Sequence, residues 1–106
     1  MRRIPLEGGG WFNRDDAQKI REDNWRGRAR VTSDPAGRQW EHEELYVTRL
    51  GRFVLRCWSE GKGFGERYVE IDAEVAAAWL VRNDVEPDPG MVGIAAIMEA
   101  LDVAEI

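Results

Sequence analysis

The sequence has few of the residues that build disulfide frameworks and metal sites. Its 106 residues include one cysteine, Cys57, and one histidine, His42. A single cysteine excludes an internal disulfide and is typical of a reducing compartment. A single histidine excludes a zinc site that needs a pair of histidines. We therefore expect a cytoplasmic protein without a bound metal or cofactor.

Long apolar runs are also absent from the sequence. The longest runs, such as residues 75–81, are far shorter than the roughly 18 apolar residues that a membrane-spanning helix needs. A glycine tract at residues 8–10 follows the charged start of the chain, where a signal peptide would have its apolar core. The sequence thus predicts neither a membrane partner nor secretion.

The composition predicts a single folded domain. The chain is 43% apolar and 33% charged, and 106 residues leave no room for a second core. We expect one domain over residues 1–106, with residues 1–10 as a flexible arm. The net charge of −5 is unevenly spread: residues 1–30 have eight basic and five acidic side chains, whereas residues 61–106 have three basic and ten acidic ones. Such a chain can present surfaces of both signs to a partner.

The pattern near the N-terminus predicts a short helix over residues 14–23. Asn13 is suited to cap this helix, because its side-chain oxygen can accept from the free amides of the first turn. Further along the chain, apolar and polar residues alternate, which is typical of strands. We expect strands over residues 28–32 and 39–42, joined by a turn at residues 34–37.

The clearest strands form a hairpin over residues 45–49 and 52–59, with Leu50 and Gly51 as its loop. This register places Tyr46 opposite Leu55. One face, which we expect in the core, then carries Tyr46, Phe53, Leu55 and Cys57. The other face carries Leu45, Val47 and Val54 together with Arg49, Arg52 and Arg56. A slip of one residue would exchange these faces.

A last strand over residues 66–71 leads into two helices. Asp72 is suited to cap the first helix, which ends at Asn83. Asp88 and Pro89 are suited to begin the second, which extends over residues 89–101. The pattern therefore predicts an α+β fold: a short N-terminal helix, an antiparallel meander of four or five strands, and two C-terminal helices packed on one face.

Residues suited to catalysis are scarce. Cys57 and His42 are the only candidates for a nucleophile and its base, and the chain has no nucleophile elbow, phosphate-binding loop or EF-hand. A small buried strand cysteine and a surface histidine beside exposed acids account for these two residues. We therefore predict that the protein is not an enzyme.

Aromatic residues and arginines favour a protein-binding role, because they are the usual anchors of protein interfaces. Five tryptophans are many for so small a core. We expect Trp11 and Trp79 in the core. We expect partner contacts at Trp25, Trp40, Phe64, Arg49, Arg52 and Arg56. The predicted function is that of a binding module that covers a surface of a protein partner.

A single-stranded nucleic acid is the alternative partner. Arg26, Arg28 and Arg30 would lie on one face of a strand, and a glycine-rich loop contains Lys62 and Phe64. This loop resembles the start of the RNA-binding motif of RNA-recognition and cold-shock domains. Two charged residues follow it, where those families have an aromatic and a β-branched residue. The overall acidity of the chain also opposes binding to a phosphate backbone.

Self-association is a separate prediction. The last helix is apolar on nearly all sides, so it either completes the core or covers a partner. In the second case, a homodimer would bury Val92, Ala95, Ala96 and Met98 against their symmetry mates.

A longer resemblance rests on residues 40–48, 51–55, 58–59 and 76–80. In these segments the chain resembles small bacterial hypothetical proteins that are often found among plasmid and phage genes. The resemblance spans residues 11–83. It implies a small accessory protein of the cytoplasm, of which inhibitors of host defence, including anti-CRISPR proteins, are one kind. It implies no catalytic or binding residue.

Overall fold

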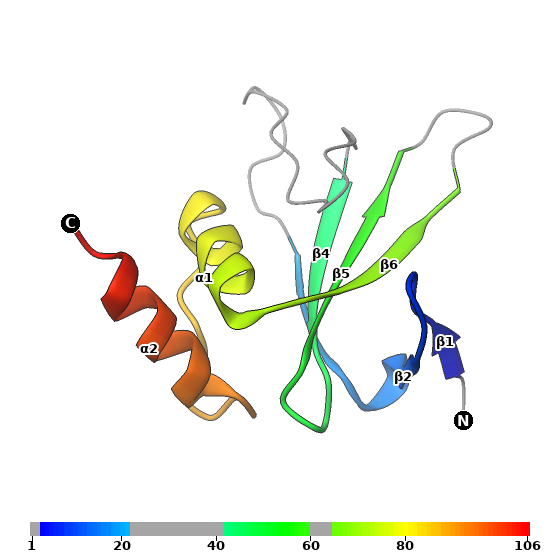
Figure 1. The fold of residues 1–106 in the computed structure, drawn as a ribbon, viewed down its shortest axis with the longest axis horizontal. Coiled ribbons are helices and arrows are strands. Elements are labelled where there is room, and N and C mark those ends of the chain that lie inside the picture. Colours follow the sequence, from blue (N-terminus) through cyan, green and yellow to red (C-terminus); the bar gives the residue numbers. More distant parts are fainter. Residues whose placement is uncertain (1–2, 22–41, 60–64) are drawn as a thin grey trace.

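The computed structural model of the chain describes residues 3–21, 42–59 and 65–106 (Figure 1). Its centre is an antiparallel sheet, with two helices on one side and a small N-terminal hairpin on the other. The predicted α+β class is therefore confirmed. The strand predicted over residues 28–32, the turn after it and most of the strand predicted over residues 39–42 lie outside the described residues.

The central sheet is a meander in the order β3-β4-β5-β6. Its strands are β3 (Gln18–Arg21), β4 (His42–Val47), β5 (Phe53–Trp58) and β6 (Arg67–Ile71). Each strand pairs antiparallel with its neighbour. The predicted hairpin and the predicted last strand are both confirmed as elements.

The helix predicted over residues 14–23 is wrong. A single 3-10 turn, η1 (Arg14–Asp16), takes its place, and the chain then continues as strand β3. Asn13 caps this turn as expected, because its side-chain oxygen accepts from the Asp15 amide at 3.0 Å. The segment that follows pairs with β4 and packs Ile20 against the core, and these long-range contacts outweigh the local helix preference.

Part of the arm that we expected to be flexible forms a hairpin. Strands β1 (Arg3–Pro5) and β2 (Trp11–Asn13) pair antiparallel, and the glycine tract between them has positive φ at all three positions. Ile4 and Phe12 pack from this hairpin onto the sheet. Their burial supplies the hydrophobic contact that holds the segment in place.

The β4–β5 hairpin differs by one residue from the predicted register. Tyr46 lies opposite Val54, where the sequence predicted Leu55. The faces of β4 are therefore exchanged relative to the prediction. Leu45 and Val47 face the helices, whereas Tyr46 faces the N-terminal hairpin. The prediction for β5 is confirmed, because the helix side of the core contains Phe53, Leu55 and Cys57.

The cause of this shift is the loop of the hairpin. The Thr48 amide donates to the Arg52 carbonyl at 2.8 Å, so the loop comprises residues 49–51 and not only Leu50 and Gly51. Gly51 adopts a φ of 77°, and its amide donates to the Thr48 carbonyl at 2.9 Å. A glycine in the left-handed region is the usual end of such a longer hairpin loop.

Helix α1 (Ala73–Arg82) begins and ends as predicted. The Asp72 side chain accepts from the Val75 amide at 2.9 Å, and Asn83 ends the helix. After Asn83 the chain passes through Asp84, whose φ is 56°, and this allows the Val85 amide to donate back into the last turn of the helix.

Helix α2 (Ile94–Ala104) begins later than the predicted Pro89. Asp88 caps a turn instead of the helix, because its side chain accepts from the Gly90 amide at 2.9 Å. Gly93, with a φ of 82°, is the N-cap residue directly before the helix. The helix packs against α1 and lies outside it with respect to the sheet (Figure 1).

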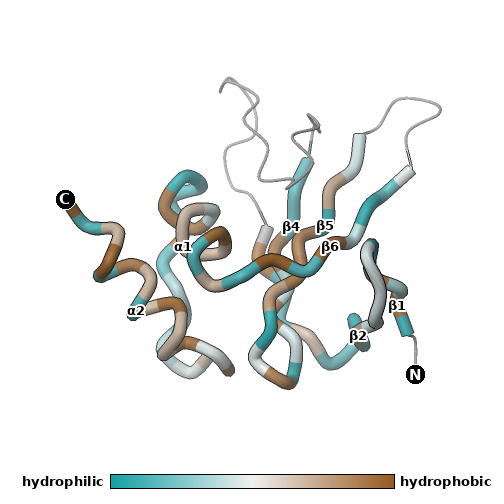
Figure 2. Tube along the Cα trace, in the orientation of Figure 1, coloured by the Kyte–Doolittle hydropathy of each residue, from teal (hydrophilic) through white to brown (hydrophobic). Residues whose placement is uncertain are grey.

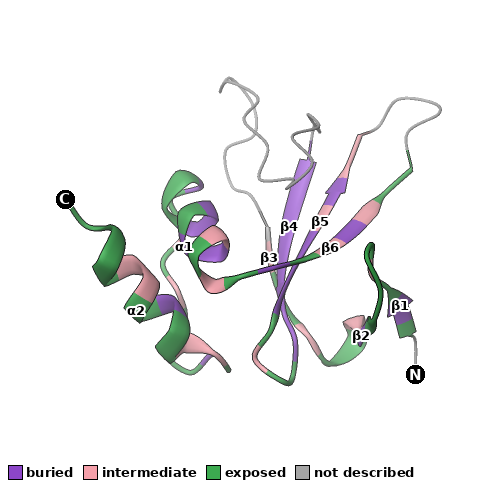
Figure 3. Cartoon of the chain, in the orientation of Figure 1, coloured by how far each residue is buried: buried purple, intermediate pink, exposed green. Residues whose placement is uncertain are grey.

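The sheet has a hydrophobic core on each of its faces. The larger core joins the sheet to the helices around the fully buried Trp79, as predicted for this residue. The smaller core joins the sheet to the N-terminal hairpin and contains Ile4, Phe12, Tyr46, Val54 and Tyr68. Figure 2 shows the apolar segments of the sheet between these layers, and Figure 3 shows that β4 is buried along its whole length.

Among the described residues, neither helix is long and apolar enough to pass through a lipid bilayer.

The start of α2 contacts the β4–β5 loop directly, because Gly93 lies against Gly51. This contact can be tested with a single substitution. A Cβ added to Gly93 would lie 3.0 Å from the Gly51 carbonyl oxygen, whereas a Cβ added to Gly10, whose φ of 86° is similar, would meet nothing within 4 Å. Both alanine variants strain the backbone, but only Gly93→Ala also forces two segments apart. We expect it to lower the free energy of unfolding by about 1–3 kcal/mol more than Gly10→Ala in urea titrations. Equal losses would contradict the contact.

Candidate functional site

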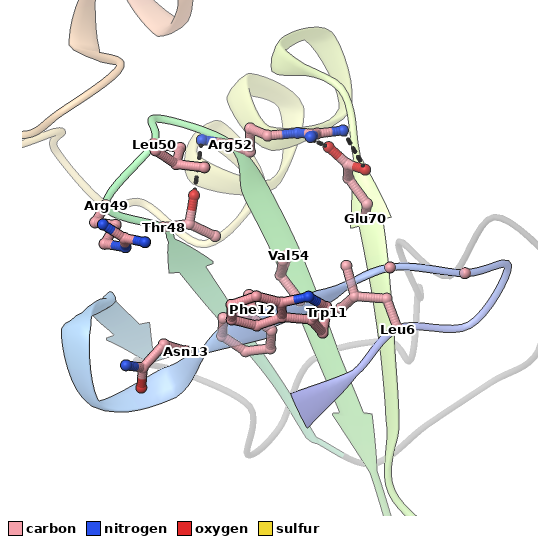
Figure 4. A pocket seen from close by; sticks show the side chains of 12 residues that line it. Leu6, Trp11, Phe12, Asn13, Thr48, Arg49, Leu50, Arg52, Val54 and Glu70 are labelled. Carbon is pink, nitrogen blue, oxygen red and sulfur yellow. Dashed lines mark hydrogen bonds and ion pairs between the residues drawn. The ribbon is translucent and has the colours of Figure 1, made fainter. Parts of the chain in front are cut away.

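A cleft of about 370 Å³ lies between the N-terminal hairpin and the β4–β5 loop (Figure 4). Its apolar floor includes Leu6, Phe12 and Val54. Two of these side chains come from the hairpin and one from β5, so the cleft exists because the hairpin folds back onto the sheet. Its volume is at the lower end of the range typical of ligand pockets.

Trp11 forms one wall of this cleft. Its side chain is 49% exposed, so the expectation that it lies in the core is wrong. Side chains alternate along a strand, and the neighbouring Phe12 occupies the core side. The guanidinium of Arg3 lies 5.0 Å from the centre of the Trp11 ring, which restrains the indole through a cation–π contact.

The β4–β5 loop forms the opposite wall with Arg49 and Leu50. Leu50 is 72% exposed, so its large apolar side chain is accessible beside a concave surface. Arg49 is exposed, and it makes no ion pair with any of the residues that the structure describes. This wall therefore combines an accessible apolar side chain with an accessible positive charge.

Arg52 lies at the rim of the cleft and pairs with a carboxylate of the neighbouring strand. Its Nε and Nη2 atoms donate to the Glu70 carboxylate at 2.6 and 2.9 Å, and its amide donates to the Thr48 hydroxyl at 3.1 Å. Because Glu70 balances the charge of Arg52, Arg49 is the guanidinium that remains open to a ligand.

Arg56 is not part of the cleft. One of its terminal nitrogens lies 2.6 Å from the buried Glu44 carboxylate, and the other lies 2.6 Å from Glu66. The guanidinium also lies 4.2 Å from the centre of the Trp58 ring. Burial lowers the pKa of Arg56, but the hydrogen bonds to Glu44 and Glu66 outweigh this effect and raise the pKa above the ordinary value of a guanidinium. Arg56 therefore stays charged and holds neighbouring strands together.

His42 and Cys57 are both buried strand residues. Cys57 is fully buried, as predicted, and its thiol lies 4.0 Å from the Glu43 carboxylate. His42 is 7% exposed and stacks on Trp58 with ring centres 5.1 Å apart, so its predicted surface position is wrong. The acids after it are also buried, because the layers on both faces of β4 cover them. In the described part of the chain, no group of histidine, cysteine and carboxylate side chains is placed to hold a metal ion.

The structure brings together only some of the residues predicted to contact a partner. Arg49 and Arg52 both line the cleft, and Arg56 lies apart from them. The other predicted contacts lie outside the described residues: Trp25, Trp40 and Phe64, and for nucleic acid Arg26, Arg28, Arg30, Lys62 and Phe64. The residues predicted for a dimer, Val92, Ala95, Ala96 and Met98, are exposed on and before α2. The helix joins the core through the buried Ile97 and the partly buried Ile94 and Leu101.

Sequence reasoning missed Trp11 and Leu50. The signal for Trp11 is the pair Trp11-Phe12 directly after a glycine tract, because two adjacent aromatic residues in a strand cannot both face the same core. The signal for Leu50 is its position in the hairpin loop, where side chains are exposed.

No family model matches this sequence, and it matches neither a curated protein nor a solved structure.

The buried ion pair of Arg56 and Glu44 predicts a large loss of stability when it is broken. Arg56→Met removes the nearest positive charge from the Glu44 carboxylate, whose side chain is 0% exposed and which, among the described residues, keeps only Lys19, at 4.0 Å, as a cation. We therefore expect a loss of about 3 kcal/mol in the free energy of unfolding. The matched control is Arg52→Met, because its pair with Glu70 is exposed and contributes only about 0–1 kcal/mol. The double variant Arg56→Met/Glu44→Met should recover part of the loss. Similar losses for Arg56→Met and Arg52→Met in urea titrations would contradict this interpretation.

The burial of the Tyr46 phenol leads to a prediction of how the free energy of unfolding changes at high pH. Burial raises the pKa of its phenol above the ordinary value of about 10, and the Glu44 carboxylate raises it further. The folded chain thus binds this proton more tightly than the unfolded chain. The resulting stabilisation is complete below about pH 10 and is lost as the pH rises above it. We expect the free energy of unfolding of Tyr46→Phe to fall less steeply than that of the wild type above this pH. Parallel curves would show that Tyr46 does not contribute.

Proposed function

We propose that this protein is a non-enzymatic binding module that holds a short segment of a protein partner in the cleft. The observation that carries this proposal is the pair of exposed apolar side chains on its two walls, Trp11 and Leu50. Large exposed side chains around a concave apolar floor are the usual anchors of a protein interface.

The chemistry of the cleft supports a particular kind of segment. The apolar floor suits a large aliphatic or aromatic side chain, and the open guanidinium of Arg49 suits a carboxylate beside it. Arg52 contributes shape more than charge, because it is already paired with Glu70. The proposed ligand is therefore a peptide segment with a bulky apolar residue next to an aspartate or glutamate.

Peptide selection tests this proposal. Random peptides displayed on phage are selected on the immobilised chain, and we expect the enriched sequences to combine a bulky apolar residue with a neighbouring acid. In anisotropy titrations, Leu50→Asp and Arg49→Glu should each weaken the best peptide at least about tenfold.

The matched control is Val81→Asp, which makes the same kind of change at a side chain that is 66% exposed on α1, away from the cleft. It should leave the affinity unchanged. The absence of enriched peptides, or peptides that bind Arg49→Glu as tightly as the wild type, would contradict the proposal. The variant Trp40→Ala/Phe64→Ala, in the same titration, tests the contacts predicted from the sequence.

The alternative function, binding of single-stranded nucleic acid, depends on residues outside the described part of the chain. Anisotropy titrations with labelled single-stranded and double-stranded DNA and RNA test it directly. Affinity that falls steeply as salt rises would favour this alternative. The prediction of an inhibitor from a mobile element rests on the sequence resemblance and stays a prediction.

A further inference from the structure

A second groove, of about 690 Å³, lies between α1 and α2. On α1 it is lined by residues that follow one face of the helix, since they are spaced three and four positions apart. These residues are Glu74, Ala77, Ala78, Val81 and Arg82. On α2 the lining is the C-terminal end of the helix, residues 100–105. The groove is separate from the cleft, which is formed by the N-terminal hairpin and the β4–β5 loop.

The lining of this groove is apolar and accessible. Val81 is 66% exposed and Val103 is 79% exposed, and both line it. Figure 2 shows that α2 is rich in apolar residues, and Figure 3 shows that most of the helix is exposed. Alanines such as Ala78 and Ala100 add little bulk, so the backbone of another helix can approach closely. The shape is thus suited to a third helix lying along the other two.

The charge of the helical region is mostly negative. Residues 73–106, which contain both helices, have seven carboxylate side chains and one arginine, Arg82. Both helices run toward the same end of the molecule (Figure 1), and α2 has no basic residue in its last turn. The negative end of the α2 dipole therefore adds to the carboxylates of Asp102 and Glu105, which line the groove, whereas Arg82 in the last turn of α1 offsets the dipole of that helix. A partner with positive charge beside its apolar side is the complementary one.

We propose that the groove between α1 and α2 binds an amphipathic helix of a partner protein, with its apolar side in the groove and lysines or arginines along its edges. A second copy of this chain is a poor occupant, because its own helices would bring carboxylates against Glu74, Asp102 and Glu105, the three acidic residues that line the groove. The dimer predicted through Val92, Ala95, Ala96 and Met98 would use a part of the chain that does not line this groove. This proposal does not depend on the cleft.

Two designed peptides test the proposal in anisotropy titrations with the full chain. Both have 18 residues and the same leucine face; one has lysines along its edges and the other has glutamates, and circular dichroism verifies that both are helical. We expect the lysine peptide to bind more weakly as salt rises, and to bind at least about tenfold more tightly than the glutamate peptide. Val81→Lys should weaken it at least about tenfold, since it removes an apolar contact and adds a repelling charge.

The matched control is Leu50→Lys, which makes the same change at the cleft and should leave the affinity for the lysine peptide unaltered. Failure of the lysine peptide to bind at millimolar concentration would overturn the proposal, as would equal binding of the glutamate peptide. Sedimentation equilibrium measures whether the chain forms a dimer. A dimer that Val81→Lys dissociates would show that a second copy occupies the groove and would also overturn the proposal. None of these outcomes bears on the phage selection at the cleft.

Discussion

The burial of β4 on both faces is the constraint on which the rest of the structure depends. Every residue of this strand is buried, including the neighbouring carboxylates of Glu43 and Glu44, which project to opposite sides of the sheet. A buried charge requires a partner on its own side. On the helix side, the Trp79 indole donates to Glu43 at 3.1 Å; on the hairpin side, Arg56 donates to Glu44 at 2.6 Å. Helix α1 thus supplies the polar partner of one buried carboxylate, whereas the partner of the other comes from strand β5 of the sheet itself.

The covering of the sheet on both faces also explains where large apolar side chains remain exposed. The hairpin covers the middle of its face of the sheet with Phe12, so Trp11 is left at the edge beside the β4–β5 loop. On the other face, α1 fills the space over the sheet with Trp79, and α2 packs on α1, leaving much of its own apolar surface exposed. The cleft therefore lies beside the N-terminal hairpin, and the groove lies between the two helices. The sheet holds these outer elements in place and forms only a small part of the cleft.

The sequence predicted the parts of the fold that local chemistry determines. The cap at Asp72, the end of α1 at Asn83 and the alternation of β5 follow from signals within a few residues, and all are confirmed. The errors occur where distant contacts decide the structure. The segment after Asn13 is a strand because β4 pairs with it, and the hairpin register depends on one additional loop residue before Gly51. For the site, the arginines of the loop could be found from the pattern. The pair Trp11-Phe12 indicates that one of the two rings is exposed, but the place of Trp11 beside this loop depends on a hairpin that folds back from the glycine tract.

The contact between Gly51 and Gly93 has a mechanical consequence. Gly51 belongs to the loop that carries Arg49 and Leu50, and Gly93 directly precedes α2. A methyl group on Gly93 would lie 3.0 Å from the Gly51 carbonyl oxygen, so one of the two backbones would have to shift to admit it. A ligand that displaces the loop toward α2 must therefore also displace the start of α2, which costs free energy because α2 packs against α1. Because such coupling is reciprocal, a change that moves the start of α2 would in turn move the loop at the cleft. The pair of glycines therefore links the position of one wall of the cleft to the position of the outer helix.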